Sequence, residues 1–169
     1  MGIHSTAVAN RFLEHAENAE RKLTQMQLQK LVYIAHGWNL AINDRALTED
    51  HPIAWDYGPV YYDLWKALRR YGVSPVTEKV KIGDFDAGAT GRRTNQISTG
   101  SFDKDETALV DKTFEVYGKY EAFKLSAITH AEGTPWDEVF IKNEGKKSVI
   151  PNKLIKEYFY ELAGQRAAE

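Results

Sequence analysis

The stretch TQMQLQKLVYIAHGWNLAIN, residues 24–43, sets the helical character of the chain. Thr24 and Gln27 stand three positions apart, the spacing of a capping box, in which each side chain binds the other residue's backbone N–H at a helix start. Apolar residues then recur at helical spacing, at Leu28, Leu31, Val32, Ala35, Trp38 and Ile42. The pattern predicts a helix from about Gln25 to Asn43.

Similar patterns predict helices on both sides of this one. Residues 1–23 are expected to form an N-terminal helix from about Thr6, with Val8, Phe12 and Leu13 as its apolar contacts. Five further helices are expected. The first starts at Pro59 and ends at Gly72, and the second follows a cap at Ser101 or Asp103. The third covers residues 121–129, the fourth runs from about Trp136 to Phe140, and the last starts at Pro151. The fold class expected is mainly α (α+β), a compact bundle of about six to seven helices with a small β-hairpin element.

The β element is placed at residues 53–57, IAWDY. Pro52 blocks a helix here, and the aromatic and β-branched residues favour an extended segment. We expect it to pair with Ala46 to Thr48 and to end at Gly58 and Pro59.

Residues 73–101 are poor in large apolar side chains and contain the tract AGATGRRTNQ. Val76, Val80 and Ile82 are compatible with a short strand, and we expect the rest of the segment to form an exposed, mobile loop. Its glycines with Arg92 and Arg93 fit an anion site, but the Walker pattern is missing because no Lys precedes a Ser or Thr after the glycine. The two arginines remain candidates for contact with an acidic surface or with phosphates.

Composition limits the class of protein. With 169 residues, the chain is expected to be a single domain over residues 1–169. The formal net charge of -2 gives no general attraction to nucleic acid or anionic lipid. There is no cysteine, and the longest apolar run has five residues against roughly 20 needed to span a bilayer. We therefore expect a cytoplasmic protein with no membrane contact and no direct nucleic-acid partner.

The segment THAEGTPW, residues 129–136, resembles a small catalytic or metal site. The five histidines are scattered, and His130 and Glu132 would point to different sides of a helix, so no metal or other cofactor is expected. A turn at Gly133 would still bring the pair together for acid–base catalysis, but no nucleophile elbow or oxyanion loop accompanies it. The alternative is a structural corner, with Gly133 at positive φ, Pro135 starting the next turn and Trp136 covering the joint.

Aromatic residues are frequent, with four Trp, nine Tyr and seven Phe. Two interpretations stay open: exposed aromatics that anchor a partner, or aromatics that line the edge of the core.

Three segments together carry a resemblance to a family. LQKLVYIAHGWNLA (28–41), IAWDYGPVYYDLWKALRRYG (53–72) and LSAITHAEGTPW (125–136) resemble the Panacea antitoxin-like domain of SocA-like antitoxins and GepA-like phage-associated proteins, over about residues 24–160. The resemblance implies a helical domain without catalysis, so no enzyme is expected. It also implies that the matching residues form a structural signature, namely Trp55, Gly58, Pro59, His130, Glu132, Gly133, Pro135 and Trp136.

The implied function is the antitoxin half of a type II toxin–antitoxin system, which binds a cognate toxin directly. The alternatives are an adaptor that delivers a toxin to an AAA+ protease, a phage-associated accessory protein and, after these, an enzyme using His130 and Glu132. Members often carry an extra DNA-binding segment, from which this chain departs. A homodimer through the aromatic surface remains open. The candidate partner-binding residues are Tyr57, Tyr61, Tyr62, Trp65, Arg92 and Arg93.

Overall fold

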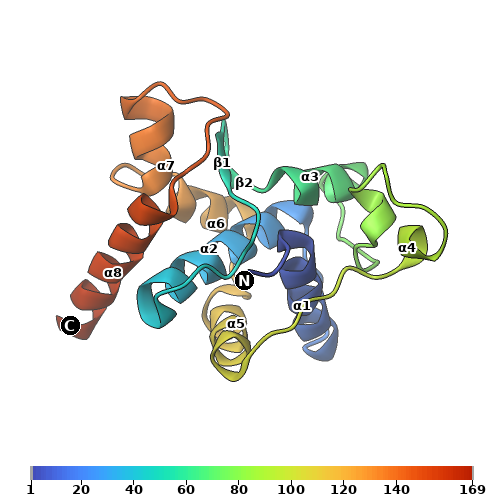
Figure 1. The fold of residues 1–169 in the computed structure, drawn as a ribbon. Coiled ribbons are helices and arrows are strands. Elements are labelled where there is room, and N and C mark those ends of the chain that lie inside the picture. Colours follow the sequence, from blue (N-terminus) through green and yellow to red (C-terminus); the bar gives the residue numbers. More distant parts are fainter. Residues whose placement is uncertain (1, 169) are drawn as a thin grey trace.

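The computed structural model describes residues 2–168 and is built mainly of helices (Figure 1). Its helices and strands are α1 (Ser5–Asn18), α2 (Gln25–Asn43), β1 (Ile53–Trp55), β2 (Gly58–Val60), α3 (Tyr62–Leu68), α4 (Arg92–Asn95), α5 (Lys104–Tyr117), α6 (Ala122–Thr129), α7 (Pro135–Asp137) and α8 (Asn152–Ala168). Two 3-10 turns (Arg69–Tyr71 and Ile82–Asp84) and a π-helical turn (Glu138–Lys142) complete it. The expected class, mainly helical with a small hairpin, is confirmed.

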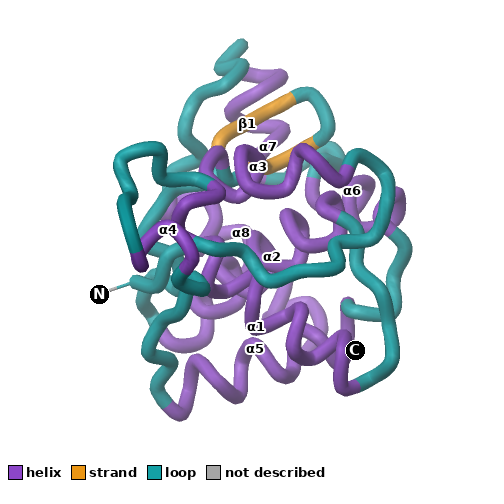
Figure 2. The backbone as a smooth tube through the Cα atoms, turned by 90° about the vertical axis from the view of Figure 1, so that its right-hand side faces the viewer, coloured by secondary structure: helices purple, strands orange, loops and turns teal. Residues whose placement is uncertain are grey.

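Helix α2 lies at the centre and contacts α1, α3, α5, α6, α8 and β2 (Figure 2). It begins with the predicted capping box: the Thr24 N–H donates to Gln27 Oε1 over 2.8 Å, and Gln27 N–H donates to Thr24 Oγ1 over 3.4 Å. Its observed bounds are those predicted from the sequence. Every residue from Leu28 to Leu40 is buried, so the helix is covered on all sides.

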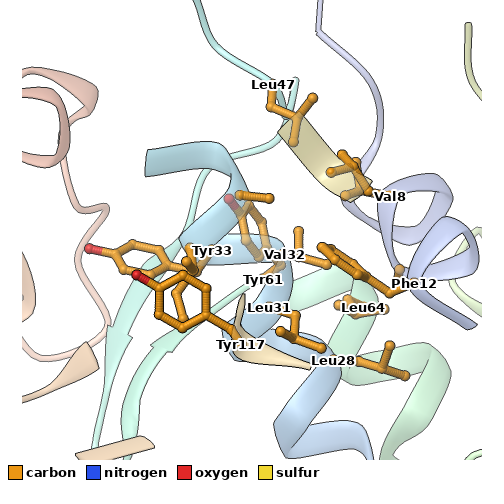
Figure 3. Packing of buried hydrophobic residues seen from close by; sticks show 14 of the residues in the cluster. Val8, Phe12, Leu28, Leu31, Val32, Tyr33, Leu47, Tyr61, Leu64 and Tyr117 are labelled. Carbon is orange, nitrogen blue, oxygen red and sulfur yellow. The ribbon is translucent and has the colours of Figure 1, made fainter. Parts of the chain in front are cut away.

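The core forms where α1 and α3 pack against α2. Figure 3 shows Phe12 of α1 beside Leu64 of α3 and Val32 of α2, with Leu28 and Leu31 of α2 below them and Val8 of α1 nearer to Leu47. These side chains are fully buried, and each such burial stabilises the fold by about 1.5–3 kcal/mol.

The hairpin partner differs from the predicted one. Ile53–Trp55 pairs with Gly58–Val60 across a two-residue turn, and not with Ala46 to Thr48. Pro59 therefore belongs to β2, and the next helix begins three residues later, at Tyr62. The proline fits because it stands opposite Ala54, whose own N–H and C=O bond outward to Ser148 and Lys147, so the pair needs no N–H from position 59.

The segment 73–101 is more structured than an irregular loop. It contains the turn Ile82–Asp84 and α4, while the short strand expected around Val76, Val80 and Ile82 is reduced to two isolated bridges, Lys81 with Ile97 and Pro75 with Thr24. Asn10 of α1 holds both arms of the segment: its Nδ2 donates to the carbonyls of Val80 and Ser98, each over 2.9 Å, and its Oδ1 accepts from Val80 N–H over 2.7 Å. The exposed part lies between these anchors.

None of the described helices has both the length and the apolar composition needed to cross a membrane.

Candidate functional site: an apolar groove beside the hairpin

A groove of about 930 Å³ opens between the N-terminal half of α2, the hairpin, α3 and the start of α6. Most of its surface is apolar. Its lining residues are Thr24, Gln25, Met26, Gln29, Lys30, Ala54, Trp55, Asp56, Tyr57, Val60, Trp65, Gly72, Val73, Ala122, Phe123, Phe140, Lys146 and Lys147. The size and character are those of a binding site.

Trp55 and Trp65 form one wall of the groove, and Tyr62 supports this wall from behind. Trp55 meets Trp65 edge to face with ring centroids 5.2 Å apart, and Tyr62 stacks on Trp65 at 5.8 Å. Lys66 lies 5.1 Å from the Tyr62 ring and Arg69 5.3 Å from the Trp65 ring. Such contacts each contribute about 0.5–1.5 kcal/mol beyond burial, so the wall is preorganised.

Exposed apolar side chains gather at the rim of the groove. Tyr57 is 71% exposed, Val73 95% and Phe123 85%. Tyr57 is fixed against α6, because its carbonyl accepts a hydrogen bond from Ser126 Oγ over 2.8 Å. Exposed apolar side chains around a groove are typical of interaction sites, so this rim is a candidate surface for binding.

The floor of the groove contains polar residues of α2. Gln29 bonds both backbone groups of Tyr61, with Nε2 donating to its carbonyl over 3.0 Å and Oε1 accepting from its N–H over 2.8 Å. Lys30 donates from Nζ to the Pro59 carbonyl over 2.9 Å. Burial lowers the pKa of the Lys30 ammonium to about 7. These two side chains occupy the outer edge of β2, so no free strand edge is offered there.

The segment 129–136 forms a corner behind the groove. His130 ends α6 and its Nδ1 donates to the Ser126 carbonyl over 2.5 Å, while Glu132 is exposed. No hydrogen bond or ion pair joins His130 to Glu132 in the part of the chain that the structure describes. Gly133 has φ +85°, as predicted.

The same corner attaches to the hairpin. Pro135 occupies the first turn of α7 after the Thr134 cap, and Trp136 Nε1 donates to the Trp55 carbonyl over 2.6 Å. Gly58 has φ +110°, and a Cβ there would lie 3.0 Å from Lys30 Nζ. The Trp136 bond therefore attaches the corner to Trp55, a residue of the groove wall.

The candidate contact residues separate into three groups. Tyr57 and Trp65 line the groove, and Tyr62 supports it. Tyr61 is 0% exposed, with its hydroxyl 3.1 Å from Thr48 Oγ1, so its selection as a surface contact is wrong. Arg92 and Arg93 lie in α4, which packs on the turn Ile82–Asp84 and stands apart from the hairpin (Figure 1).

One cluster has the residue types of a metal site. Ligand atoms of His4, Asp50 and Asp63 lie within 4.8 Å of one another. Each carboxylate already has partners: His4 Nε2 is 3.1 Å from Asp63, and Asp50 accepts from the Ser5 N–H over 2.8 Å. Lys66 adds an ion pair to Asp63 at 3.1 Å. We interpret the cluster as an ion-pair network that anchors the start of α1.

A family model and a curated relative both match this chain. The family model described as Antitoxin SocA-like, Panacea domain, matches residues 28–137, which include the hairpin, Trp65 and Phe123. The chain is also similar to Antitoxin SocA of Caulobacter vibrioides (strain NA1000 / CB15N), with 28% identity over 160 residues that cover 93% of this chain and 82% of that protein. No solved structure gives a significant match.

Proposed function

The chain belongs to the SocA-like antitoxin family defined by the Panacea domain, and we propose that it neutralises a cognate toxin by binding it directly, as the antitoxin of a type II pair. The observation that carries this proposal is the apolar groove with its exposed rim. Rim residues such as Phe123 and Val73 add little to the core, because they are almost fully exposed.

Masking a toxin in this way is a binding mechanism that needs no chemical step. Burying an exposed Phe or Val side chain in a complex contributes about 1.5–3 kcal/mol, and a few such residues dominate a typical interface. Trp65 presents an aromatic surface in a wall that is already formed, and Tyr57 adds exposed aromatic surface at the rim. Binding a partner therefore costs little conformational entropy on this side of the interface, because the wall is already ordered.

Co-expression tests the proposal. This chain and the product of the adjacent reading frame are placed under separate promoters in a bacterial host. We expect the neighbouring product to stop growth alone, and this chain to restore growth and to co-purify with it. Growth arrest that persists while both proteins accumulate would contradict direct neutralisation.

The level of the toxin separates masking from delivery to an AAA+ protease. Masking predicts that the toxin remains abundant in the complex. Delivery predicts that its level falls when this chain is present and recovers in a host that lacks the protease.

A further inference from the structure

The groove contains hydrogen-bond donors that lack acceptors. Lys30 is 1% exposed, and of its three N–H groups one has an acceptor among residues 2–168, the Pro59 carbonyl at 2.9 Å. No described carboxylate lies within ion-pair distance of its Nζ. A buried ammonium without a counter-charge costs folding free energy, and the low pKa of Lys30 reflects that cost.

A second donor lies in the same lining. The indole Nε1 of Trp55 is buried and has no hydrogen-bond partner in the described part of the chain. The Trp55 carbonyl, by contrast, is used by Trp136. Buried donors normally find partners, so these two donors have capacity for a further acceptor, which an occupant of the groove can supply.

The lining of the groove has more basic than acidic side chains. Lys146 and Lys147 line it together with Lys30, against one lining carboxylate, Asp56, which is exposed. A complementary occupant therefore carries negative charge as well as apolar surface.

The hairpin excludes one mode of binding. Ala54 N–H donates to the Ser148 carbonyl over 2.9 Å, and its own carbonyl accepts from Lys147 N–H over 2.7 Å. With the Pro59 carbonyl taken by Lys30, both outer edges of the hairpin are occupied. An incoming segment binds through its side chains and not by adding a strand.

We propose that the groove binds an apolar segment of the partner protein that carries an Asp or Glu, and that this carboxylate pairs with Lys30 and accepts from Trp55 Nε1. The proposal rests on the proposed function and names the chemistry of the partner's binding segment. Large apolar side chains of the segment cover Phe123 and Trp65. The cost of burying Lys30 in the free protein is offset in the complex.

Peptide selection tests this recognition. A phage-displayed library of random 12-residue peptides is selected on the full-length protein, on Lys30→Met and on Lys153→Met, a control in which an exposed lysine of α8 is changed. We expect the first and third selections to enrich peptides with Asp or Glu among large apolar residues. Lys30→Met, which keeps the length of the side chain without the charge, should lose the acidic residue from its selected peptides.

The selected peptide is then made with Glu and with Gln at the acidic position. We expect the Gln form, or the Lys30→Met protein, to bind at least about tenfold more weakly. Lys30→Met should melt at an equal or higher temperature, because a buried charge is removed. Equal affinity for both peptides, or enrichment without acidic residues, would overturn the proposal.

Calorimetry with the unaltered protein gives a second readout if Lys30→Met fails to fold. Pairing with a carboxylate raises the pKa of Lys30, so binding at pH 8 should take up about one proton per peptide, measured in two buffers of different ionisation enthalpy. No proton uptake would contradict the pairing. If co-expression restores growth while peptides bind without these features, the antitoxin function stands and this recognition fails.

Discussion

Gly37 of α2 lies directly against the ring of Phe159 of α8, and a Cβ at position 37 would be 2.2 Å from Cε2 of that ring. Phe159 is buried and meets Trp38 edge to face with centroids 5.1 Å apart. The missing side chain therefore sets the distance at which the last helix covers the central one.

Replacing Gly37 with Ala is expected to lower the free energy of unfolding by about 1–3 kcal/mol, because the added methyl forces the two helices apart. Urea unfolding followed by circular dichroism measures this. Gly164→Ala is the matched control: it lies in α8, where an added Cβ would meet no atom within 4 Å, and it should raise stability by up to about 1 kcal/mol. A Gly37→Ala protein as stable as the wild type would contradict the close packing.

His36 makes stability depend on pH. Its Nδ1 accepts from the N–H groups of Leu47 and Thr48 at 3.3 and 3.2 Å, so the proton is on Nε2, which donates to Asn152 over 2.9 Å. Burial lowers the pKa of His36 from 6.5 to about 4. The unfolded chain therefore binds a proton at higher pH than the folded one, and the stability present above pH 6.5 is lost as pH falls toward 4.

Urea unfolding at pH 7.5 and 4.5 checks this titration. We expect the wild type to lose about 2–3 kcal/mol more than His36→Gln between the two pH values, since the variant lacks the titrating group. The variant should start from a lower stability at pH 7.5. Parallel losses in the two proteins would show that His36 is not the group responsible.

Asn10 should control the order of the segment 76–98. Asn10→Ala leaves the Val80 N–H without its acceptor and should cost about 1–3 kcal/mol. Hydrogen exchange should accelerate in residues 76–98 and stay slow in α2. Glu17→Ala, an exposed change on the same helix, should leave the exchange pattern unaltered. Unchanged exchange in Asn10→Ala would mean that other contacts hold the segment.

The pair His130 and Glu132 distinguishes a corner from a catalytic site. His130→Ala removes the bond to the Ser126 carbonyl and should lower stability by about 1–2 kcal/mol, whereas Glu132→Ala should change it by less than about 0.5 kcal/mol. Neither change should reduce neutralisation per folded molecule. Loss of neutralisation in both variants, with stability retained, would support acid–base chemistry.

Capping residues in the sequence were sufficient to predict where helices α2 and α5 begin. The capping pair Thr24 and Gln27 places α2, and Asp103 with Glu106 forms a second capping box that begins α5, which decides between the two caps proposed for that helix. The hairpin was assigned to the wrong partner because its turn, Asp56 and Tyr57, has no glycine, and because Pro59 is equally compatible with a helix start.

The burial of polar residues in α2 could not be predicted from the spacing of its apolar residues. A helical repeat identifies one apolar face, but whether the opposite face is covered depends on α8, β2 and other segments distant in sequence. The repeat therefore does not identify Gln29, Lys30 and His36 as buried, although each side chain bonds to another segment inside the fold. One signal in the sequence does indicate that both faces of α2 are covered. A solvent-exposed helix face normally has several charged residues, but Lys30 is the one charged side chain between Gln25 and Asn43.

The affinity of the Phe123→Asp variant for the growth inhibitor tests most directly whether the groove is the neutralising surface. Phe123 is 85% exposed, so the change should leave the melting temperature unaltered while placing a charge on the apolar rim. We expect Kd to rise at least about tenfold and growth protection to be lost, with Tyr160→Asp, a 68% exposed position on α8, behaving as wild type. Wild-type affinity and full protection by Phe123→Asp would contradict the assignment of the groove.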